Sequence, residues 1–393
     1  MKLDGLRVLD LSLFLPGPHF TMMMADHGAE VIKVEPPGEG EPNRHIGARE
    51  DGTSVYFRNT HRGKKSITAD LKDATQRAAL LELAATADVF VEAFRPGVVD
   101  RLGVGYEDVK AVNPDVVYVS LSGFGSEGPY RDRSAYDTVI QAYGGFAAAQ
   151  ADPETHTPDF LRQTAADKVT ALFAGQAVTA ALFARERGRG GQHIELAMTD
   201  AVVSFLWADA AANEVLMESD GSEPSSFVAG FRPMRFSDGW GIVTPTSDHD
   251  FHGMCRALRV EGWDDPRIAT IAERNQNRDV LEPVIDMCYA MAANLTMVEA
   301  TERFEAERVP FAMILSPDEI TRDPHAVAIG LFEEFDHPVT GRTRLPRHPA
   351  RFAATPATLG GPSPGLGEHT DEILEELGLG DRIEALRAAG VVA

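Results

Sequence analysis

The stretch that decides the fold is RVLDLSLFLPGPHFTMMMADHGAEVIKVE, residues 7–35. Its two ends, RVLDL (Arg7–Leu11) and AEVIKVE (Ala29–Glu35), are short apolar runs typical of buried strands. Between them, His19–Asp26 has a helical composition and ends before Gly28, which suits the C-cap of a helix. The stretch therefore predicts a strand, a helix and a second strand.

Further apolar runs continue this alternation. DVFVE at Asp88–Glu92 and VVYVSL at Val116–Leu121 are predicted strands, and Asp73–Ala85 has the composition of a helix. Strands that alternate with helices form βαβ units, whose strands lie parallel in one sheet. The sequence therefore predicts an α/β fold. The loop after the first strand lacks the GxGxxG pattern, so a nicotinamide dinucleotide site is not indicated.

The middle and the end of the chain have other patterns. Residues 136–215 are largely helical, and the polar stretch ESDGSEPSS at Glu218–Ser226 marks a boundary. Beyond it, strand-like runs flank Asp238-Gly239, a favoured hairpin turn, and two helices precede a further strand. This region is predicted to be a small α+β domain. The remainder is rich in proline and glycine and ends in short helices, predicted at 371–377 and 381–389.

Composition excludes several classes of protein. The chain has 393 residues, enough for two domains, and a formal charge of −23. Such an acidic surface repels nucleic-acid phosphates and anionic membranes, so neither is expected as a partner. The sequence contains no run of about 20 apolar residues that would span a bilayer. Cys255 and Cys288 are too few for a disulfide framework, and a cytoplasmic location is expected.

Basic side chains are concentrated in the first third of the chain. Residues 1–135 carry 16 basic and 20 acidic side chains, whereas the remainder carries 21 and 40. The basic segment HRGKKS (61–66) is a predicted loop, and Arg95 and Arg101 follow a predicted strand. Such charges often form only a solvated face. The alternative is a site for an anionic cofactor, because open α/β sheets bind ligands at the carboxyl ends of their strands and arginine suits phosphate.

Acidic residues offer further candidates. Asp167 lies in an apolar helical stretch, where it is either a reactive carboxylate or a helix cap or ion-pair partner of Lys168. Asp137 opens a helix, a position that capping explains. The cluster at 248–250, with His252, resembles metal ligands. Adjacent residues cannot all face one ion and no second cluster completes the site, so no metal is expected.

Eight segments together resemble one family, the class III coenzyme A transferases, which include the α-methylacyl-CoA racemases. They stand in the family's order and span nearly the whole chain, with the weakest match over 215–330. In chain order they are LDGLRVLDLS with ADHGAEVIKVEPPG, NTHRGKKSITADL, FVEAFRPGVVDRLGVGY, VSLSGFGSEGPY, SAYDTVIQAYGG, ADKVTAL, GRGGQHIELAMTDA and PSPGLGEHTDEIL.

The resemblance implies an architecture that the residue patterns alone do not. It implies a large Rossmann-like domain that binds coenzyme A, with its N-terminal part at 1–217, and a smaller α+β domain at 225–320. Residues 321–393 would form a linker and return to the large domain. The resemblance also implies a homodimer in which two ring-like chains are interlocked.

The resemblance also implies the site residues. The family's nucleophilic aspartate matches Asp167. Coenzyme A is implied as a thioester substrate and not as a tightly bound cofactor. The residues that match the family's coenzyme A contacts are Lys64, Phe94, Arg95, Arg101, Leu102, Ser134, Tyr136 and Asp137.

The reaction implied is transfer of coenzyme A from an acyl-CoA donor to a carboxylic acid acceptor, through an aspartyl anhydride and an aspartyl-CoA thioester. The alternative is a racemase that exchanges the α-proton of a 2-methylacyl-CoA. In those relatives a histidine stands where this chain has Tyr136, and Asp248 matches the place of their glutamate. A phenol with a pKa of about 10 is a poor proton shuttle at neutral pH, which favours transfer. A non-catalytic acyl-CoA-binding subunit, the third class, would not require Asp167.

Overall fold

The computed structural model describes residues 2–50, 53–152, 154–218, 227–339 and 341–383. The chain divides into two compact units. Unit 1 comprises Met1–Ala211 and Gly330–Ala393, and unit 2 comprises Ala212–Ile329. Residues 219–226 of the predicted linker and 384–389 of the predicted last helix lie outside the described residues.

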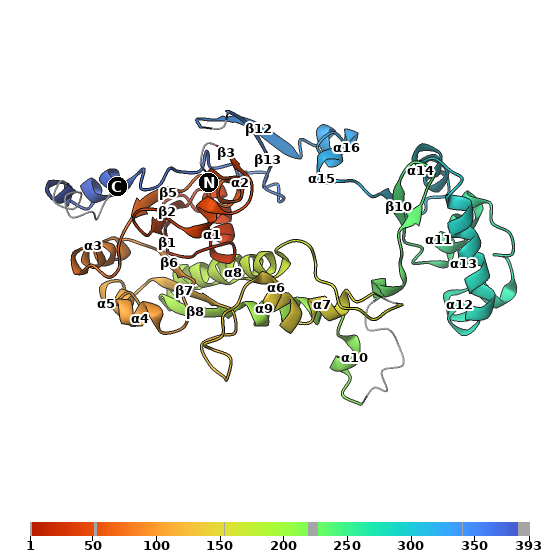
Figure 1. The fold of residues 1–393 in the computed structure, drawn as a ribbon, viewed down its shortest axis with the longest axis horizontal. Helices are drawn as coiled ribbons and strands as arrows, with labels where there is room; N and C mark the ends of the chain where they lie inside the picture. Colours follow the sequence, from red (N-terminus) through yellow and green to blue (C-terminus); the bar gives the residue numbers. More distant parts are fainter. Residues whose placement is uncertain (1, 51–52, 153, 219–226, 340, 384–393) are drawn as a thin grey trace. The chain divides into compact units, whose positions relative to one another are not determined.

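Within the described residues, unit 1 is built on a six-stranded sheet in the order β5-β2-β1-β6-β7-β8 (Figure 1). Every neighbouring pair in it is parallel. The order reverses between β1 and β6, so the loops that follow these two strands diverge and leave a crevice at the carboxyl edge. The predicted α/β fold with a parallel sheet is confirmed. The strands are β1 (Arg7–Asp10), β2 (Glu30–Glu35), β5 (Lys65–Thr68), β6 (Val89–Glu92), β7 (Val117–Ser122) and β8 (Gln192–Ala197).

The strands β1, β2, β6 and β7 are buried on both faces, which explains why they read as nearly continuous apolar runs. Successive side chains point to opposite faces, so Val117 packs with α1 and α8 while Tyr118 packs with α3 and α5. The helices of unit 1 are α1 (Pro16–Asp26), α2 (Val55–His61), α3 (Ala74–Ala84), α4 (Val98–Leu102), α5 (Tyr106–Val112), α6 (Asp137–Tyr143), α7 (Phe146–Ala149), α8 (Ala165–Ala184), α9 (Met198–Leu206) and α17 (Thr370–Glu376).

The HRGKKS segment is not simply a loop, as the sequence pattern predicted. Lys65 begins the edge strand β5, which pairs with β2. The run SIT that follows the lysines is too short to be distinguished as a strand from its own composition. The Lys65 ammonium bonds Glu30 on β2 and Glu372 on α17, at 2.6 and 2.7 Å.

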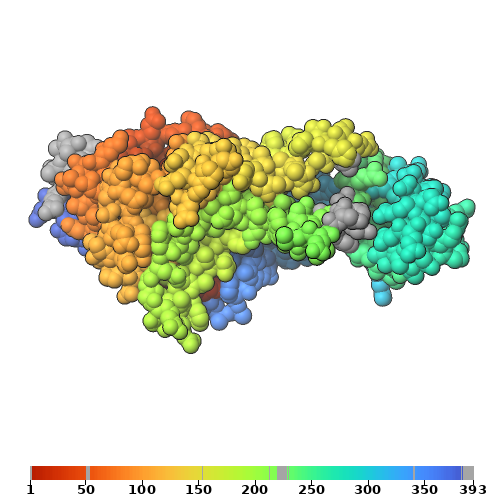
Figure 2. Space-filling view, turned by 90° about the horizontal axis from the view of Figure 1, so that it is seen from below, coloured from red at the N-terminus to blue at the C-terminus, as the bar shows by residue number. Residues whose placement is uncertain are grey.

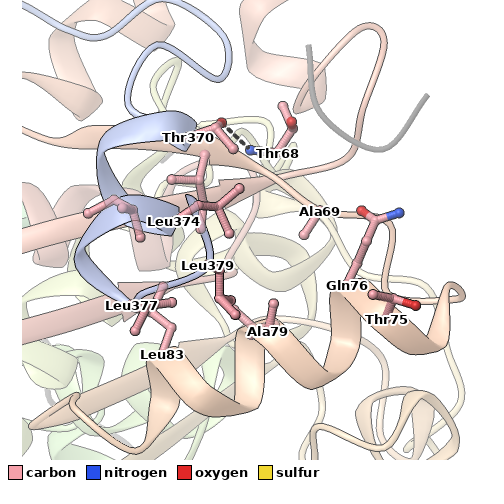
Figure 3. A pocket seen from close by; sticks show the side chains of 13 residues that line it. Thr68, Ala69, Thr75, Gln76, Ala79, Leu83, Thr370, Leu374, Leu377 and Leu379 are labelled. Carbon is pink, nitrogen blue, oxygen red and sulfur yellow. Dashed lines mark hydrogen bonds between the residues drawn. The ribbon is translucent and has the colours of Figure 1, made fainter. Parts of the chain in front are cut away.

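The C-terminal part of unit 1 packs along the same edge. After an antiparallel hairpin that the sequence did not predict, β12 (Phe332–His337) with β13 (Gly341–Pro346), the chain crosses beside Gly63, whose N–H donates to the Pro362 carbonyl at 3.1 Å. In the space-filling view this C-terminal segment, coloured blue, lies against the rest of unit 1 (Figure 2). Helix α17 then packs on β5 and α3, where the two elements line a small apolar space of about 50 Å³ (Figure 3). At the edge of this space the Thr68 N–H donates to Thr370 Oγ1.

Unit 2 is a small α+β unit with its own core. Its described strands β9 (Met234–Arg235), β10 (Trp240–Val243) and β11 (Phe311–Met313) form an antiparallel sheet, and β9–β10 is the hairpin predicted around Asp238-Gly239. Cys255 and Cys288 are buried in this core with their Sγ atoms 3.9 Å apart. The helices are α10 (Ala212–Val215), α11 (Asp248–Leu258), α12 (Ile271–Gln276), α13 (Arg278–Ala292), α14 (Met297–Ala306), α15 (Pro317–Ile320) and α16 (Pro324–Ala328).

Close backbone contact between Gly63 and Gly360 gives a test of this C-terminal packing. Gly63 has a positive φ of 69°, and a Cβ on it would lie 2.6 Å from the Gly360 Cα. Gly63→Ala should therefore destabilise the protein by about 2 kcal/mol or more, since conformational strain and overpacking add. Gly47→Ala, also at positive φ (80°) but in open space, should cost only the strain. Thermal unfolding of both variants checks this, and equal losses would contradict it.

Candidate active site

Two helices of unit 1 begin at the same point. Helix α6 begins with Asp137, and α8 begins with Ala165, whose preceding residue Thr164 makes no side-chain capping bond. The cap of α8 comes instead from Asp137, whose Oδ2 accepts the Asp167 N–H at 3.0 Å. Asp137 therefore caps a helix, but that helix is α8 and not α6, the helix that Asp137 itself begins.

Gln141 holds the segment that leads into α8. Its side-chain amide donates to the Asp137 carboxylate and to the Gln163 carbonyl, and its Oε1 accepts the Leu161 N–H at 2.9 Å. Gln141 is fully buried. The positions of Asp137 and of the first turn of α8 are therefore fixed by one side chain.

The Asp167 carboxyl is buried at this junction, with 8% of the residue exposed. Burial raises its pKa to about 7, and the negative charge of Asp137 adds to this shift. Both effects destabilise the ionised form relative to a carboxylate in water. The result is a weakly solvated carboxylate at the start of a helix, which is suited to nucleophilic attack once ionised.

Asp167 and Asp137 line a cavity of about 670 Å³, which we call the Asp167 cavity. Its wall is mainly apolar, with neutral polar groups near the two acids. The lining residues are Leu13, Phe14, Pro16, Asn43, Ile46, Tyr56, Ala93, Leu121, Ser122, Gly123, Ala135, Tyr136, Asp137, Thr138, Phe160, Leu161, Gln163, Thr164, Asp167 and Met198. The two acids come from loops and helices that begin at the carboxyl edge of the sheet.

A second cavity of about 190 Å³, the arginine pocket, is lined by the guanidinium-bearing side chains Arg95, Arg131 and Arg133. Arg95 donates to Ser134 Oγ at 2.7 Å, and the Arg133 guanidinium lies 3.5 Å from the centre of the Tyr130 ring. Its remaining lining residues are Phe14, Ala93, Phe94, Pro96, Ser122, Gly123, Ser134, Ala135 and Tyr136. Planar guanidinium groups gathered in this way suit phosphate.

The structure brings together most of the residues singled out from the sequence. Phe94, Arg95, Ser134 and Tyr136 line the arginine pocket, and Tyr136, Asp137 and Asp167 line the Asp167 cavity. Arg101 and Leu102 end the short helix α4 and are not among the described residues that line either cavity. Leu102 packs against the apolar core, whereas Arg101 is exposed.

Lys64 lies elsewhere and is fully buried. Its ammonium donates to Asp10 Oδ2, to the Pro18 carbonyl and to Thr21 Oγ1, each at 2.9 Å. Burial alone would raise the pKa of Asp10, but Lys64 and Lys33 outweigh it and hold that pKa well below the usual value. All three ammonium donors are used within unit 1, and the contact between Lys64 and coenzyme A that the resemblance implies stays a prediction.

Other basic residues of the first third are paired inside unit 1 in the same way, a role that net-charge counting could not reveal. The pairs are Arg7 with Glu30 and Glu376, Lys33 with Glu41, Arg44 with Glu35, Arg62 with Asp26, and Lys65 with Glu30 and Glu372. The concentration of basic residues in this region therefore reflects internal ion pairs as well as the arginine pocket.

The site also contains residues that sequence reasoning did not single out. Arg131 and Arg133 belong to the charged run YRDRS, which ends at Ser134. This run could have indicated a site for an anion. Phe14, which lines both cavities, was not predicted as a site residue.

In unit 2, Asp248 bonds Arg274 at 2.5 Å, and Ser247 caps α11. No group of three or more potential metal ligands is found within the described part of the chain.

Comparisons with known proteins place the chain in a family. The model of the family described as CoA-transferase family III matches residues 3–370. The mouse (Mus musculus) succinyl-CoA:glutarate CoA-transferase is 33% identical, over 99% of this chain and 90% of its own. The succinyl-CoA–D-citramalate CoA-transferase of Chloroflexus aurantiacus is 32% identical, over 95% of this chain and 94% of its own.

A solved structure agrees with these matches. The crystal structure of a CaiB/BaiF family protein from Brucella suis has a TM-score of 0.82 and 32% identity, and the match covers 95% of this chain and 99% of that one. The protein is thus an enzyme of the CoA-transferase class. The chain belongs to CoA-transferase family III, as the resemblance of its motifs indicated. Among the described residues, no helix is long and apolar enough to cross a membrane.

The buried position of Lys64 gives a test that separates structure from binding. Lys64→Met leaves the Asp10 carboxylate buried without its cation and should destabilise the protein by about 3–5 kcal/mol. The double variant Asp10→Asn, Lys64→Met should recover part of that loss, because no unpaired charge remains. Thermal unfolding measures both. A Lys64→Met protein that melts like the wild type but binds coenzyme A more weakly would restore the binding role.

Proposed function

We propose that the protein transfers coenzyme A from an acyl-CoA to a free carboxylic acid, with Asp167 as the nucleophile. The observation that carries this proposal is the buried Asp167 carboxyl in a cavity that adjoins a pocket of arginines. The relatives named succinyl-CoA:glutarate and succinyl-CoA–D-citramalate CoA-transferase support transfer between acids. The donor and acceptor acids of this chain are left open by the proposal.

In this proposal the arginine pocket receives the phosphates of coenzyme A. The guanidinium groups of Arg95, Arg131 and Arg133 supply positive charge there, and Phe94 lines the same pocket. The thioester end of the molecule then extends into the Asp167 cavity. The lining residues common to both cavities support a continuous path.

The proposed chemistry proceeds by four acyl transfers. First, an Asp167 oxygen attacks the thioester carbonyl, the C–S bond breaks, and an anhydride and the coenzyme A thiolate form. Second, the thiolate attacks the Asp167 carbonyl, which gives an aspartyl-CoA thioester and frees the donor carboxylate. Third, the acceptor carboxylate attacks that thioester and again frees the thiolate. Fourth, the thiolate attacks the acceptor's carbonyl, which gives the new acyl-CoA and the Asp167 carboxylate.

This sequence conserves the thioester's free energy, and no proton is consumed overall. Its intermediates hydrolyse readily, so the site has to exclude water during the exchange. The apolar wall of the Asp167 cavity supports that requirement. The raised pKa of Asp167 reflects weak solvation of the carboxylate, which supports its use as a nucleophile.

Several expectations from the resemblance belong to this proposal. The strand order of unit 1 supports the description of that unit as Rossmann-like. The domain limits of 1–217, 225–320 and 321–393 stay predictions, and so do the interlocked homodimer and the cytoplasmic location.

A trapping experiment tests the nucleophile. A panel of acyl-CoA donors is mixed with the enzyme in the presence of hydroxylamine, which converts an activated aspartyl carbonyl to a hydroxamate. Peptide mass spectrometry should find the hydroxamate on Asp167, together with loss of transfer in Asp167→Asn. Asp200→Asn, at an exposed acid of α9, is the matched control and should keep transfer activity. A hydroxamate on another residue would contradict the assignment.

The pH dependence of transfer gives a second test. Because the pKa of Asp167 is raised to about 7, its nucleophilic form is lost as the pH falls below that value. The kcat/KM for transfer should therefore rise with pH, with an acid limb near pH 7.

Asp137→Asn removes the neighbouring negative charge, while its side-chain oxygen can still accept the Asp167 N–H. The acid limb should consequently move to lower pH in this variant. A limb in the same place would show that another group controls it.

A further inference from the structure

The lining residues that the Asp167 cavity and the arginine pocket have in common are of two kinds. Ala93, Ser122, Gly123 and Ala135 are small, and Phe14 and Tyr136 are aromatic. Any molecule that reaches from one cavity into the other has to pass these side chains. They therefore form a neck between the two cavities.

The small residues lie closely packed at this neck. A Cβ added to Gly123 would lie 2.2 Å from the Cβ of Ala135, so the backbone after β7 and the segment before α6 are already in contact. The small side chains of these residues take up little of the space that the two cavities share. Phe14 and Tyr136 are therefore the only large side chains among the shared lining residues.

The two aromatic rings are in edge contact. Their centroids are 5.6 Å apart and their planes are nearly perpendicular, at 86°. This is a favourable geometry for an aromatic pair. Tyr136 is nevertheless 61% exposed, although it neighbours the buried Asp137. The pair thus lies between solvent and the neck.

Phe14 is held in this position by its backbone. It has a φ of 62°, a left-handed conformation that is strained for a residue with a side chain. The buried Asn43 amide donates to its carbonyl oxygen, and that bond fixes the loop after β1. Backbone strain kept in place by surrounding contacts is common at functional positions. In this conformation the Phe14 ring contacts the Tyr136 ring.

We infer that Phe14 and Tyr136 close over the thioester arm of acyl-CoA where it passes the neck, position that arm, and shield the reacting thioester from water. This inference rests on the proposed function. It assigns both side chains a positioning role, with no part in bond making. The exposed tyrosine ring is the element that moves onto the arm on binding, because the Phe14 loop is fixed by Asn43.

A labelling experiment tests the closure without turnover. Tetranitromethane nitrates exposed tyrosines, and Tyr143, which is 56% exposed and lines neither cavity among the described residues, is an internal control for Tyr136. Saturating desulfo-coenzyme A, which lacks the thiol, should slow nitration of Tyr136 several-fold relative to Tyr143. Peptide mass spectrometry measures both. Unchanged nitration of Tyr136 at saturation would overturn the inference.

Substitution tests the shielding. Phe14→Ala and Tyr136→Ala should raise the ratio of acyl-CoA hydrolysis to transfer several-fold, because water reaches the thioester. Tyr136→Phe, which keeps the ring, should lie much nearer to the wild-type ratio than Tyr136→Ala. Phe183→Ala removes an equally exposed ring on α8, outside both cavities, and serves as the matched control.

The two proposals fail in different ways. An unchanged ratio of hydrolysis to transfer in both alanine variants would overturn the proposed closure of Phe14 and Tyr136. An Asp167 hydroxamate in the same proteins would still support the transfer mechanism. Folding of the variants is checked by thermal unfolding. Tyr136 makes no side-chain capping bond to α6, so its removal should leave that helix intact.

Discussion

The hydrogen bond from the Asp167 N–H to the Asp137 carboxylate is the contact on which the site depends. It joins the start of α8 to the start of α6, and Gln141 locks the same junction from within. One carboxylate thereby completes a helix and raises the pKa of its neighbour. Structure and reactivity are set by the same pair of acids, so a change at Asp137 affects both.

Much of the fold could be predicted because strands buried on both faces have near-continuous apolar runs. β1, β2, β6 and β7 all follow this rule. The edge strand β5 was missed because two lysines precede a run of only three residues. Its stability comes from α17, about 300 positions along the chain, and local sequence cannot contain that information.

Only part of the candidate site could be predicted, and that part came from sequence motifs. Asp167 by itself was ambiguous, and only its place among the family's motifs distinguished it. Lys64 shows the limit of this reasoning, because a motif could not reveal that its ammonium pairs with the buried Asp10. Phe14 was not predicted as a site residue, because its residue type indicates neither its left-handed backbone nor its ring contact with Tyr136.

The return of the chain to β5 has a consequence for biosynthesis. Unit 2 is encoded between the two segments of unit 1, so the ribosome completes unit 2 before α17 emerges. Until then the N-terminal sheet has an uncovered edge at β5, with the Glu372 partner of Lys65 still missing. Uncovered strand edges promote association between chains. The nascent protein therefore stays vulnerable to aggregation until α17 has emerged from the ribosome and covered this edge.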